Sequence, residues 1–424
     1  MAEYVRRVVD RELDELMPGV AAIALQGARG TGKTETALAR AATVYRLDRP
    51  EILAVALADP DRLTRGDPPI LIDQWQAMPE SWDLVRRAVD ADRAPGRFLL
   101  TGSASPRNPP AHTGAGRIVS LRMRPMTLAE RGVAAPTVSL RHLLSGAKGR
   151  LDGETNVSLE QYAQEILASG FPGLRGLSER SARAALDGYL EHIVERDFVS
   201  VGQTLRNPAA LRRWMQAYAA AISTTTSFEK IRDAASAGRS ERPARTTSLR
   251  YVDVLEAMWV VEPVPAWRPA GSELARLTLA PKHQLVDPGL AARLRRTTMD
   301  SLLDGAPPGA LNSRHATLFG ALFEAQVTHD VRTYAQAAEG RVFHFRDKGG
   351  DHEIDLIVEG TDQRVLAIEV KLAHTVSDQH VRHLRWLRDR LGDRLLDAVV
   401  VTTGRDAYRR QDGIAVVPAA LLGA

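Results

Sequence analysis

The stretch Gly27-Ala-Arg-Gly-Thr-Gly-Lys-Thr34 decides the fold of the first third of this chain. It matches G-x-x-x-x-G-K-[ST], the phosphate-binding loop whose glycines let backbone N–H groups wrap a polyphosphate. The apolar run Val20–Leu25 predicts a buried strand before the loop, and Glu35–Ala42 predicts a helix after it. Because a helix N-terminus attracts anions, strand, loop and helix together predict a site for ATP.

Each position of this loop has an expected role in holding ATP with Mg²⁺. Lys33 would reach the β- and γ-phosphates, and the hydroxyl of Thr34 would bind Mg²⁺. The remaining contacts to the nucleotide are expected from Gly27, Ala28, Arg29, Gly30, Thr31, Gly32 and Glu35.

The composition is that of a globular protein. Of the 424 residues, 44% are hydrophobic and 25% are charged, a length and composition that suggest about three domains. No apolar run reaches the ~18 residues of a membrane span. The chain has no cysteine, which excludes disulfides and thiolate metal sites, and its start lacks a signal-peptide core. We therefore expect a cytoplasmic protein. The formal net charge is only +4, but the basic sequence pI of about 9.4 is compatible with a nucleic-acid partner.

Short apolar runs alternate with helical stretches over the first ~140 residues, which predicts an α/β fold with a parallel sheet and helices on both faces. Ligands of such sheets gather at the carboxyl ends of the strands. The candidate strands are Ala22–Leu25, Ile52–Leu57, Ile70–Ile72 and Arg97–Thr101.

Three further regions follow this core, with boundaries expected after residues 140, 204 and 298. Residues 141–204 have a helical pattern. Met299–Ala310 contains Pro and Gly and is expected to be a linker that opens a second α/β unit ending at residue 424. In the region between them, residues 205–298, we expect three helices and a hairpin. The helices are Leu211–Ser223, Phe228–Ser236 and Thr247–Met258, and the hairpin pairs Val260–Pro265 with Leu274–Ala280.

Polar residues at strand ends are expected to complete the nucleotide site. Asp73 ends one strand and would orient Mg²⁺, and Thr101 or Ser103 follows the next strand, at the position of a γ-phosphate sensor. Arg117 would be an arginine finger that reaches a neighbouring subunit, and Pro172 would pack against the base of the nucleotide. The simpler alternative for Thr101 and Ser103 is an ordinary turn after the strand. The simpler alternative for Arg117 is one more surface arginine in an arginine-rich chain.

These motifs resemble those of a known family. Gly27–Thr34, Ile72-Asp-Gln-Trp-Gln76, Leu100-Thr-Gly-Ser103 and His112–Arg117 are similar to the predicted AAA+ ATPases of the AAA_14 group. Gly170-Phe-Pro172, Pro281–Gly289 and Leu322-Phe-Glu324 are similar to the DUF4143 region that follows in that family.

The resemblance implies a fold. It implies a P-loop AAA+ core over residues 1–140, a helical lid over 141–204, a winged-helix domain over 205–298 and a restriction-endonuclease-like α/β domain over 299–424. With Arg117 acting on a neighbouring subunit, we also expect a homo-oligomer such as a hexamer, in which nucleotides bind at subunit junctions.

Gln74 departs from that family, in which the residue after the strand-end Asp is usually Glu. A Glu there would polarise the attacking water, whereas glutamine can position a water but cannot take its proton. Two explanations stay open. Gln74 is natural and gives a slow, switch-like ATPase, or it replaces a natural Glu and traps bound ATP; the intact surroundings favour the second.

The middle region carries cations suited to DNA. In a winged helix, the third helix enters the major groove and the hairpin contacts phosphates. Arg239, Arg242 and Arg245 precede the third predicted helix, and Thr247 and Arg250 lie on its first turn. These residues would bind DNA phosphates without sequence preference. The alternative is a solvated basic face, or a winged helix used for protein contacts.

Two predicted strands of the last region carry a nuclease-like pattern. Asp355 lies in one strand, and Glu369 and Lys371 lie in the next. Because alternate residues of a strand share a face, Glu369 and Lys371 project together, and Asp355 would join Glu369 to bind a divalent ion. Lys371 would orient the attacking water, and Glu324 on an upstream helix would complete the site. This D-x₁₃-E-x-K spacing resembles the PD-(D/E)xK nucleases, whose fold serves either to cut DNA or to bind it.

The sequence thus supports two main functions. The first is an AAA+ ATPase that remodels or translocates duplex or branched DNA, with a nuclease-like domain that grips or cuts it. The second is a nucleotide-gated oligomeric switch in signalling or defence, with slow ATP turnover. A plain transcription regulator would leave the Asp355–Lys371 pattern unexplained.

Overall fold

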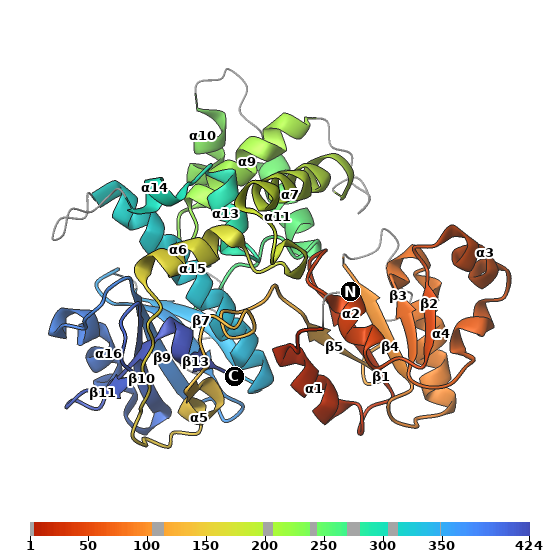
Figure 1. The fold of residues 1–424 in the computed structure, drawn as a ribbon, viewed down its shortest axis with the longest axis horizontal. Helices are drawn as coiled ribbons and strands as arrows, with labels where there is room; N and C mark the ends of the chain where they lie inside the picture. The colour runs from red at the N-terminus through yellow and green to blue at the C-terminus, as the bar shows by residue number, and fades with distance from the viewer. Residues whose placement is uncertain are drawn as a thin grey trace.

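The computed structural model describes residues 4–103, 114–197, 207–237, 244–268, 280–303, 313–347 and 349–424. The chain folds into an N-terminal sheet domain, a helical middle region and a C-terminal sheet domain (Figure 1). Helix α15 (Ser313–Ala337) runs between the middle region and the C-terminal sheet and also contacts helix α1 (Val8–Leu16) of the N-terminal domain. None of the described helices has the length and apolar character needed to cross a membrane.

The N-terminal domain contains a five-stranded parallel sheet covered on both faces, which confirms the predicted α/β class. Alternate residues of the central strands enter separate apolar clusters: Ile23 packs with Leu13, and Ala24 with Trp82. The helices are α1, α2 (Lys33–Leu38), α3 (Pro50–Ala58) and α4 (Glu80–Ala91). The strands, in order across the sheet, are β2 (Thr43–Arg46), β3 (Ile70–Asp73), β4 (Phe98–Gly102), β1 (Ala22–Gln26) and β5 (Ile118–Arg122).

One predicted strand is wrong. Ile52–Leu57 lies within helix α3, where Pro50 occupies the first turn, a position that its fixed φ favours. The apolar run predicted a buried strand, but it belongs to a surface helix in which Val55 and Leu57 are 46% and 59% exposed. The true neighbour of β3 is β2, an edge strand of partly exposed residues whose sequence lacks an apolar run. Strand β5, at the other edge, was not predicted.

The middle region is a bundle centred on α13 (Pro288–Leu294), which contacts α6, α7, α9 and α15. Side chains of Ser158, Ser178, Asn207, Ser227 and Asp287 cap the N-termini of five of its helices. Helices α9 to α11 correspond to the three that were predicted, and the expected linker begins with helix α14. The other helices are α6 (Leu159–Ala168), α7 (Glu179–His192), α9 (Pro208–Ala220), α10 (Phe228–Ser236), α11 (Arg245–Ala257) and α14 (Met299–Leu303).

The hairpin that follows α11 differs from the prediction. Val261 bridges Leu285 and Val264 bridges Lys282 in antiparallel fashion, so the second arm is residues 282–286. The predicted second arm, Leu274–Ala280, lies outside the described residues apart from Ala280. Val264 and Lys282 are fully buried. This bridged pair of the hairpin therefore lies in the interior, where it is not available to DNA phosphates.

The C-terminal domain is a six-stranded mixed sheet between two helices (Figure 1). Helix α15 packs on one face with Val358 and Ile368, and α16 (Asp378–Leu391) packs on the other with Ile357 and Ala367. In order, the strands are β11 (Tyr408–Arg409), β12 (Ala415–Pro418), β10 (Leu395–Thr402), β9 (Val365–Lys371), β8 (Glu353–Glu359) and β7 (Arg341–Arg346). Strands β12, β10 and β9 are parallel, and β9, β8 and β7 are antiparallel.

The segment after the N-terminal domain crosses to this C-terminal sheet before it enters the bundle. Strand β6 (Val138–Ser139) pairs in parallel with β13 (Leu422–Gly423). The next helix, α5 (Leu140–Leu144), contacts α15, β10 and β9. The first residues of the expected lid region therefore pack with the C-terminal domain.

Candidate nucleotide site and C-terminal charge cluster

The phosphate-binding loop joins β1 to α2 and curls around the side chain of Lys33. Gly30 and Gly32 have φ values of 81° and 99°, which favour glycine. The Lys33 ammonium donates to the carbonyl oxygens of Gly27 and Ala28, each at 2.8 Å. Within residues 4–103, the backbone N–H groups of Gly32 and Thr34 donate to no protein acceptor. The loop thus presents a cation and free amide donors, a donor set that fits a polyphosphate.

Three oxygen-bearing side chains meet beside this loop. Thr34 donates its hydroxyl hydrogen to Oδ1 of Asp73 at 2.8 Å, and Thr101 donates to the same oxygen. Asp73 and Thr101 are register partners at the ends of β3 and β4, so the sheet itself brings them together. Hydroxyl and carboxylate oxygens are the ligands that Mg²⁺ prefers, so Thr34 and Asp73 would suit an ion that accompanies the nucleotide.

Gln74 is the residue after Asp73 and has φ of 60°, an uncommon conformation for a residue other than glycine. Its backbone N–H donates to the Thr101 hydroxyl at 3.3 Å. Its side-chain oxygen accepts from the amide of Gln76 at 2.5 Å, and the same amide reaches Ser103 at 3.4 Å. Gln74, Gln76 and Ser103 therefore form an uncharged polar cluster at the position expected for a base.

Pro172 lies against the phosphate-binding loop. A Cβ atom at Gly32 would lie 3.6 Å from Cγ of Pro172, and one at Gly30 would lie 3.6 Å from the ring of Phe171. Arg117, in contrast, forms an ion pair with Asp90 of α4 at 2.8 Å. In this single chain it is not among the residues that meet at the loop, and its role toward a neighbouring subunit stays a prediction.

Two arginines beside the loop were missed by the sequence reasoning. Arg7 donates to the Thr31 carbonyl at 2.9 Å and pairs with Glu130 at 3.0 Å. Arg122 is partly buried at the end of β5, next to Gly27, with its guanidinium over the ring of Trp259 at 3.9 Å. Burial, and after it the charge of Arg122, lowers the pKa of Lys33 to about 7. No spacing rule marks either arginine, so the sequence held no signal for them.

Glu262 connects the loop side of the N-terminal domain to the rest of the chain. It accepts from Arg124 at 2.6 Å and lies 3.7 Å from both Arg122 and Arg332, the last of which is on α15. Burial would raise the pKa of Glu262, but Arg124, Arg332 and Arg122 outweigh it and hold that pKa far below its usual range. The carboxylate is therefore ionised among three cations from two domains.

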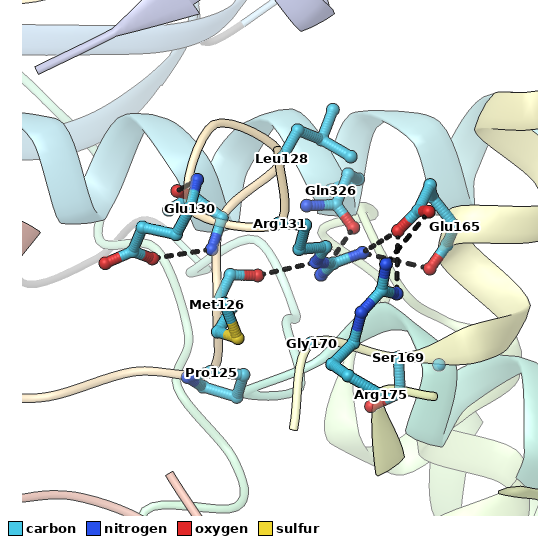
Figure 2. Close-up of polar contacts among 12 residues, drawn as sticks. Pro125, Met126, Leu128, Glu130, Arg131, Glu165, Ser169, Gly170, Arg175 and Gln326 are labelled. Carbon is cyan, nitrogen blue, oxygen red and sulfur yellow. Dashed lines mark hydrogen bonds and ion pairs between the residues drawn. The ribbon is translucent and has the colours of Figure 1, made fainter. Parts of the chain in front are cut away.

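A second network surrounds Arg131, near the end of the N-terminal domain (Figure 2). Arg131 donates to the Met126 carbonyl at 2.8 Å, to the Glu165 carbonyl at 2.9 Å and to Gln326 on α15 at 3.4 Å. The Glu165 carboxylate also pairs with Arg175 at 2.9 Å. The N-terminal domain is thus fixed to α6 and α15 just beside the Gly170–Pro172 segment.

The C-terminal residues singled out in the sequence do come together, but around an unexpected lysine. Lys282 Nζ lies 2.8 Å from Glu324 Oε1, 3.2 Å from Asp355 Oδ1 and 3.5 Å from Glu353. Lys371 is bonded to Glu369 at 2.7 Å and lies 3.5 Å from Asp355.

Asp355 also accepts from the backbone N–H of Val370 at 2.9 Å. We call Lys282, Glu324, Asp355, Glu369 and Lys371 the charge cluster. Lys282 was missed because it lies 42 residues before Glu324 and outside the nuclease-like pattern.

The charge cluster does not fit a divalent ion in this arrangement. No group of three or more acidic or histidine side chains among the described residues is placed to hold a metal. Lys282 and Lys371 contact the two oxygens of Asp355, and Lys371 contacts Oε2 of Glu369, so a metal ion at Asp355 and Glu369 stays a prediction.

The predicted DNA-contacting residues lie at the start of α11. Arg245 is 74% exposed and lies 3.5 Å from Glu229, and Arg250 is exposed. Thr247 is partly exposed on the same turn. Arg239 and Arg242 lie outside the described residues.

One family match covers the phosphate-binding loop and agrees with its assignment to an ATPase domain. Residues 20–131 match the AAA domain family AAA_14, and residues 319–422 match DUF4143, a domain of unknown function. The match over residues 20–131 indicates an AAA-like ATPase domain. Residues 159–301 match another domain of unknown function, DUF8612. Gly170–Pro172 and Pro281–Gly289, which we had compared to DUF4143, therefore fall in the DUF8612 match instead.

Two uncharacterized mycobacterial proteins resemble the chain over most of its length. Mb2031c of Mycobacterium bovis and Rv2008c of Mycobacterium tuberculosis are each 27% identical over 405 residues, which is 94% of this chain and 80% of theirs. Among solved structures, a half-complex of Thermococcus gammatolerans McrB AAA+ hexamers with bound McrC aligns with 50% of this chain and 70% of its own. That alignment has 14% identity and a TM-score of 0.19.

Proposed function

We propose that this protein binds ATP with Mg²⁺ at the phosphate-binding loop and hydrolyses it in the service of DNA handling. The observation that carries the ATP part is the meeting of Thr34 and Thr101 on one oxygen of Asp73, beside the buried Lys33. Lys33 would hold the phosphates, Thr34 and Asp73 would hold Mg²⁺, and Gln74 would position a water without accepting its proton.

Calorimetry with ATP and Mg²⁺ tests the nucleotide part. Wild type is expected to bind one ATP per chain, and Lys33→Ala is expected to lose that binding because the phosphates lose their cation. Lys230→Ala, a change of an exposed lysine on α10, is the matched control and should bind as wild type does. Equal ATP affinity in wild type and Lys33→Ala would refute the assignment of the loop.

The DNA part of the proposal rests on the exposed cations at the start of α11 and on the likeness of the C-terminal pattern to nucleases. The middle region would bind duplex or branched DNA through phosphates, and the C-terminal domain would grip or cut it. Filter binding with linear, forked and four-way DNA, read together with ATPase rates, tests this. If the protein binds none of these DNA forms, the DNA part of the proposal is wrong.

A nucleotide-gated switch with slow turnover is the second candidate, and the surroundings of Gln74 favour it. A cluster of two glutamines and a serine offers no group that could take the proton of a water. In a switch, ATP would change the oligomeric state, with Arg117 reaching the neighbouring subunit. Light scattering with and without ATP distinguishes the two: a switch changes its mass with ATP and its ATPase rate does not respond to DNA.

A further inference from the structure

Lys282 is an ammonium group placed where the C-terminal carboxylates converge. Its side chain is 1% exposed, and it contacts Glu324 from α15 together with Asp355 and Glu353 from β8. Lys282 itself belongs to neither element, because it comes from the hairpin that leads out of the middle region. A segment of one region thus supplies the counter-ion for the acidic residues of another.

The cluster also retains an oxygen that no protein group satisfies. Oε1 of Glu369 is buried without a hydrogen-bond partner, although Oε2 accepts from Lys371. The ammonium groups of Lys282 and Lys371 lie within 3.5 Å of the other carboxylate oxygens named above, in places that a divalent ion would take.

The strand that carries Lys282 is tied to the nucleotide side of the molecule. Five residues further on, the buried carboxylate of Asp287 accepts from the backbone N–H of Gly170 at 2.8 Å. Gly170 directly precedes Phe171 and Pro172, which lie on the phosphate-binding loop. Displacement of that segment would pull on the strand of Lys282 through a short and buried connection.

We propose that Lys282 is an internal cation that closes the C-terminal carboxylate cluster, and that a divalent ion binds there only when Lys282 is withdrawn. Lys282 and the metal compete for the same oxygens of Glu324 and Asp355. The inference rests on the proposed function in one respect, the nuclease-like character of the C-terminal carboxylates. Mn²⁺ binding itself is measured without ATP or DNA. Failure of ATP binding or of DNA binding would leave this test unaffected.

The test is a Mn²⁺ titration of the full chain, followed by the electron paramagnetic resonance signal of free Mn²⁺. Removal of the competing charge in Lys282→Met is expected to create a Mn²⁺ site at least about tenfold tighter than any site of the wild type. The site should vanish in Lys282→Met/Asp355→Asn, which separates it from metal bound at Thr34 and Asp73. Lys230→Met is the control and should titrate as wild type does.

Thermal unfolding provides a second readout if Lys282→Met is poorly folded. The variant leaves buried carboxylates without their cation, so Mn²⁺ should raise its Tm, or restore its fold, in a manner that requires Asp355. Two results would overturn the inference. One is a variant that binds Mn²⁺ no better than wild type and gains no stability from it. The other is a wild type that already holds an Asp355-dependent ion as tightly as the variant.

Discussion

The backbone N–H of Gly170 donates to Oδ2 of Asp287 over 2.8 Å, across 117 residues of sequence. The Gly170 carbonyl in turn accepts from Met126 of the N-terminal domain at 2.7 Å. Gly170 therefore joins three parts of the molecule: the segment on the phosphate-binding loop, the N-terminal domain and the strand that holds Lys282. Because these bonds are buried, a change in the loop that moves Phe171 and Pro172 has a direct path to the charge cluster.

Replacement of Gly170 by Ala should disrupt this junction. A Cβ atom there would lie 2.5 Å from Arg131 Nη2 and 2.6 Å from the Met126 carbonyl oxygen, so the backbone must shift. Overpacking of this kind costs ~1–3 kcal/mol of the free energy of unfolding. We expect a lower Tm and weaker ATP binding, because Pro172 is drawn off the loop. Gly173→Ala, where the added Cβ meets nothing within 4 Å, is the matched control. Equal ATP affinity in Gly170→Ala and wild type would show that the junction does not support the loop.

Lys33 predicts proton uptake when ATP binds. Burial lowers its pKa from 10.5 to about 7, so at pH 8.5 the amine of the free protein is mostly neutral. Phosphates favour the charged form, so ATP binding should take up close to one proton at pH 8.5 and far less at pH 6. Calorimetry in buffers of different ionisation enthalpy measures this uptake. An uptake that does not change between pH 6 and pH 8.5 would contradict the buried position of Lys33.

The same group affects stability in a defined direction. Between pH 7 and 10.5 the unfolded chain binds more protons at Lys33 than the folded chain does. The contribution of Lys33 to the free energy of unfolding should therefore rise with pH across that window. A Lys33→Met variant should show a flatter pH dependence of Tm over the same range.

Gln74→Glu should accelerate ATP hydrolysis. A carboxylate that can take the proton of the attacking water adds ~10²–10⁴-fold to a rate, and residue 74 directly follows Asp73, whose carboxylate contacts Thr34 and Thr101. Phosphate release at saturating ATP is the measurement, and Gln74→Ala is the control that should gain nothing. A Gln74→Glu chain that binds ATP but turns over no faster would count against both explanations of Gln74.

The features predicted from the sequence are those carried by contiguous residues. The phosphate-binding loop and its strand and helix lie within twenty residues, and the register of β3 and β4 brings Asp73 to Thr101 as alternating parallel units require. The apolar run in α3 was misread because an exposed helix and a buried strand share that composition over six residues.

Contacts between distant segments could not be predicted. Arg124 and Glu262 are 138 residues apart, and Lys282 and Asp355 are 73 apart. Each of these charges is unremarkable in its own stretch, and only the folded chain brings them within bonding distance. The buried position of Val264 and Ala266 could not be predicted for the same reason. Their sequence is that of any apolar strand, and only the folded chain places Ala266 beside His344 of β7.

Glu262→Gln should destabilise the junction between the domains. Without the carboxylate, Arg122, Arg124 and Arg332 lie buried near one another with no countercharge, which costs ~3–5 kcal/mol. Chemical denaturation at pH 7 measures the loss. Glu179→Gln, which breaks an exposed pair with Arg183, should cost less than ~1 kcal/mol.

The loss in Glu262→Gln should also depend on pH. The pKa of Glu262 in the folded chain lies below its ordinary value of 4.5, so its stabilising effect is present above that pH and is lost as the pH falls further. The difference in Tm between wild type and Glu262→Gln should therefore narrow as the pH is lowered below 4.5. A difference that stays constant into acid would mean that the ionised carboxylate is not what holds the three arginines.

Arg245→Ala/Arg250→Ala should reduce the salt dependence of DNA affinity. Both cations are exposed at the start of α11, and each phosphate contact that is lost lowers the slope of log affinity against log salt by about 1. Fluorescence anisotropy with a labelled duplex at several salt concentrations gives the slope, which should fall by about 2 for the double variant. Arg11→Ala/Arg180→Ala removes two exposed cations from α1 and α7 and should leave the slope unchanged. If both double variants lose the same amount, α11 is not the DNA-contacting helix and the affinity reflects net charge alone.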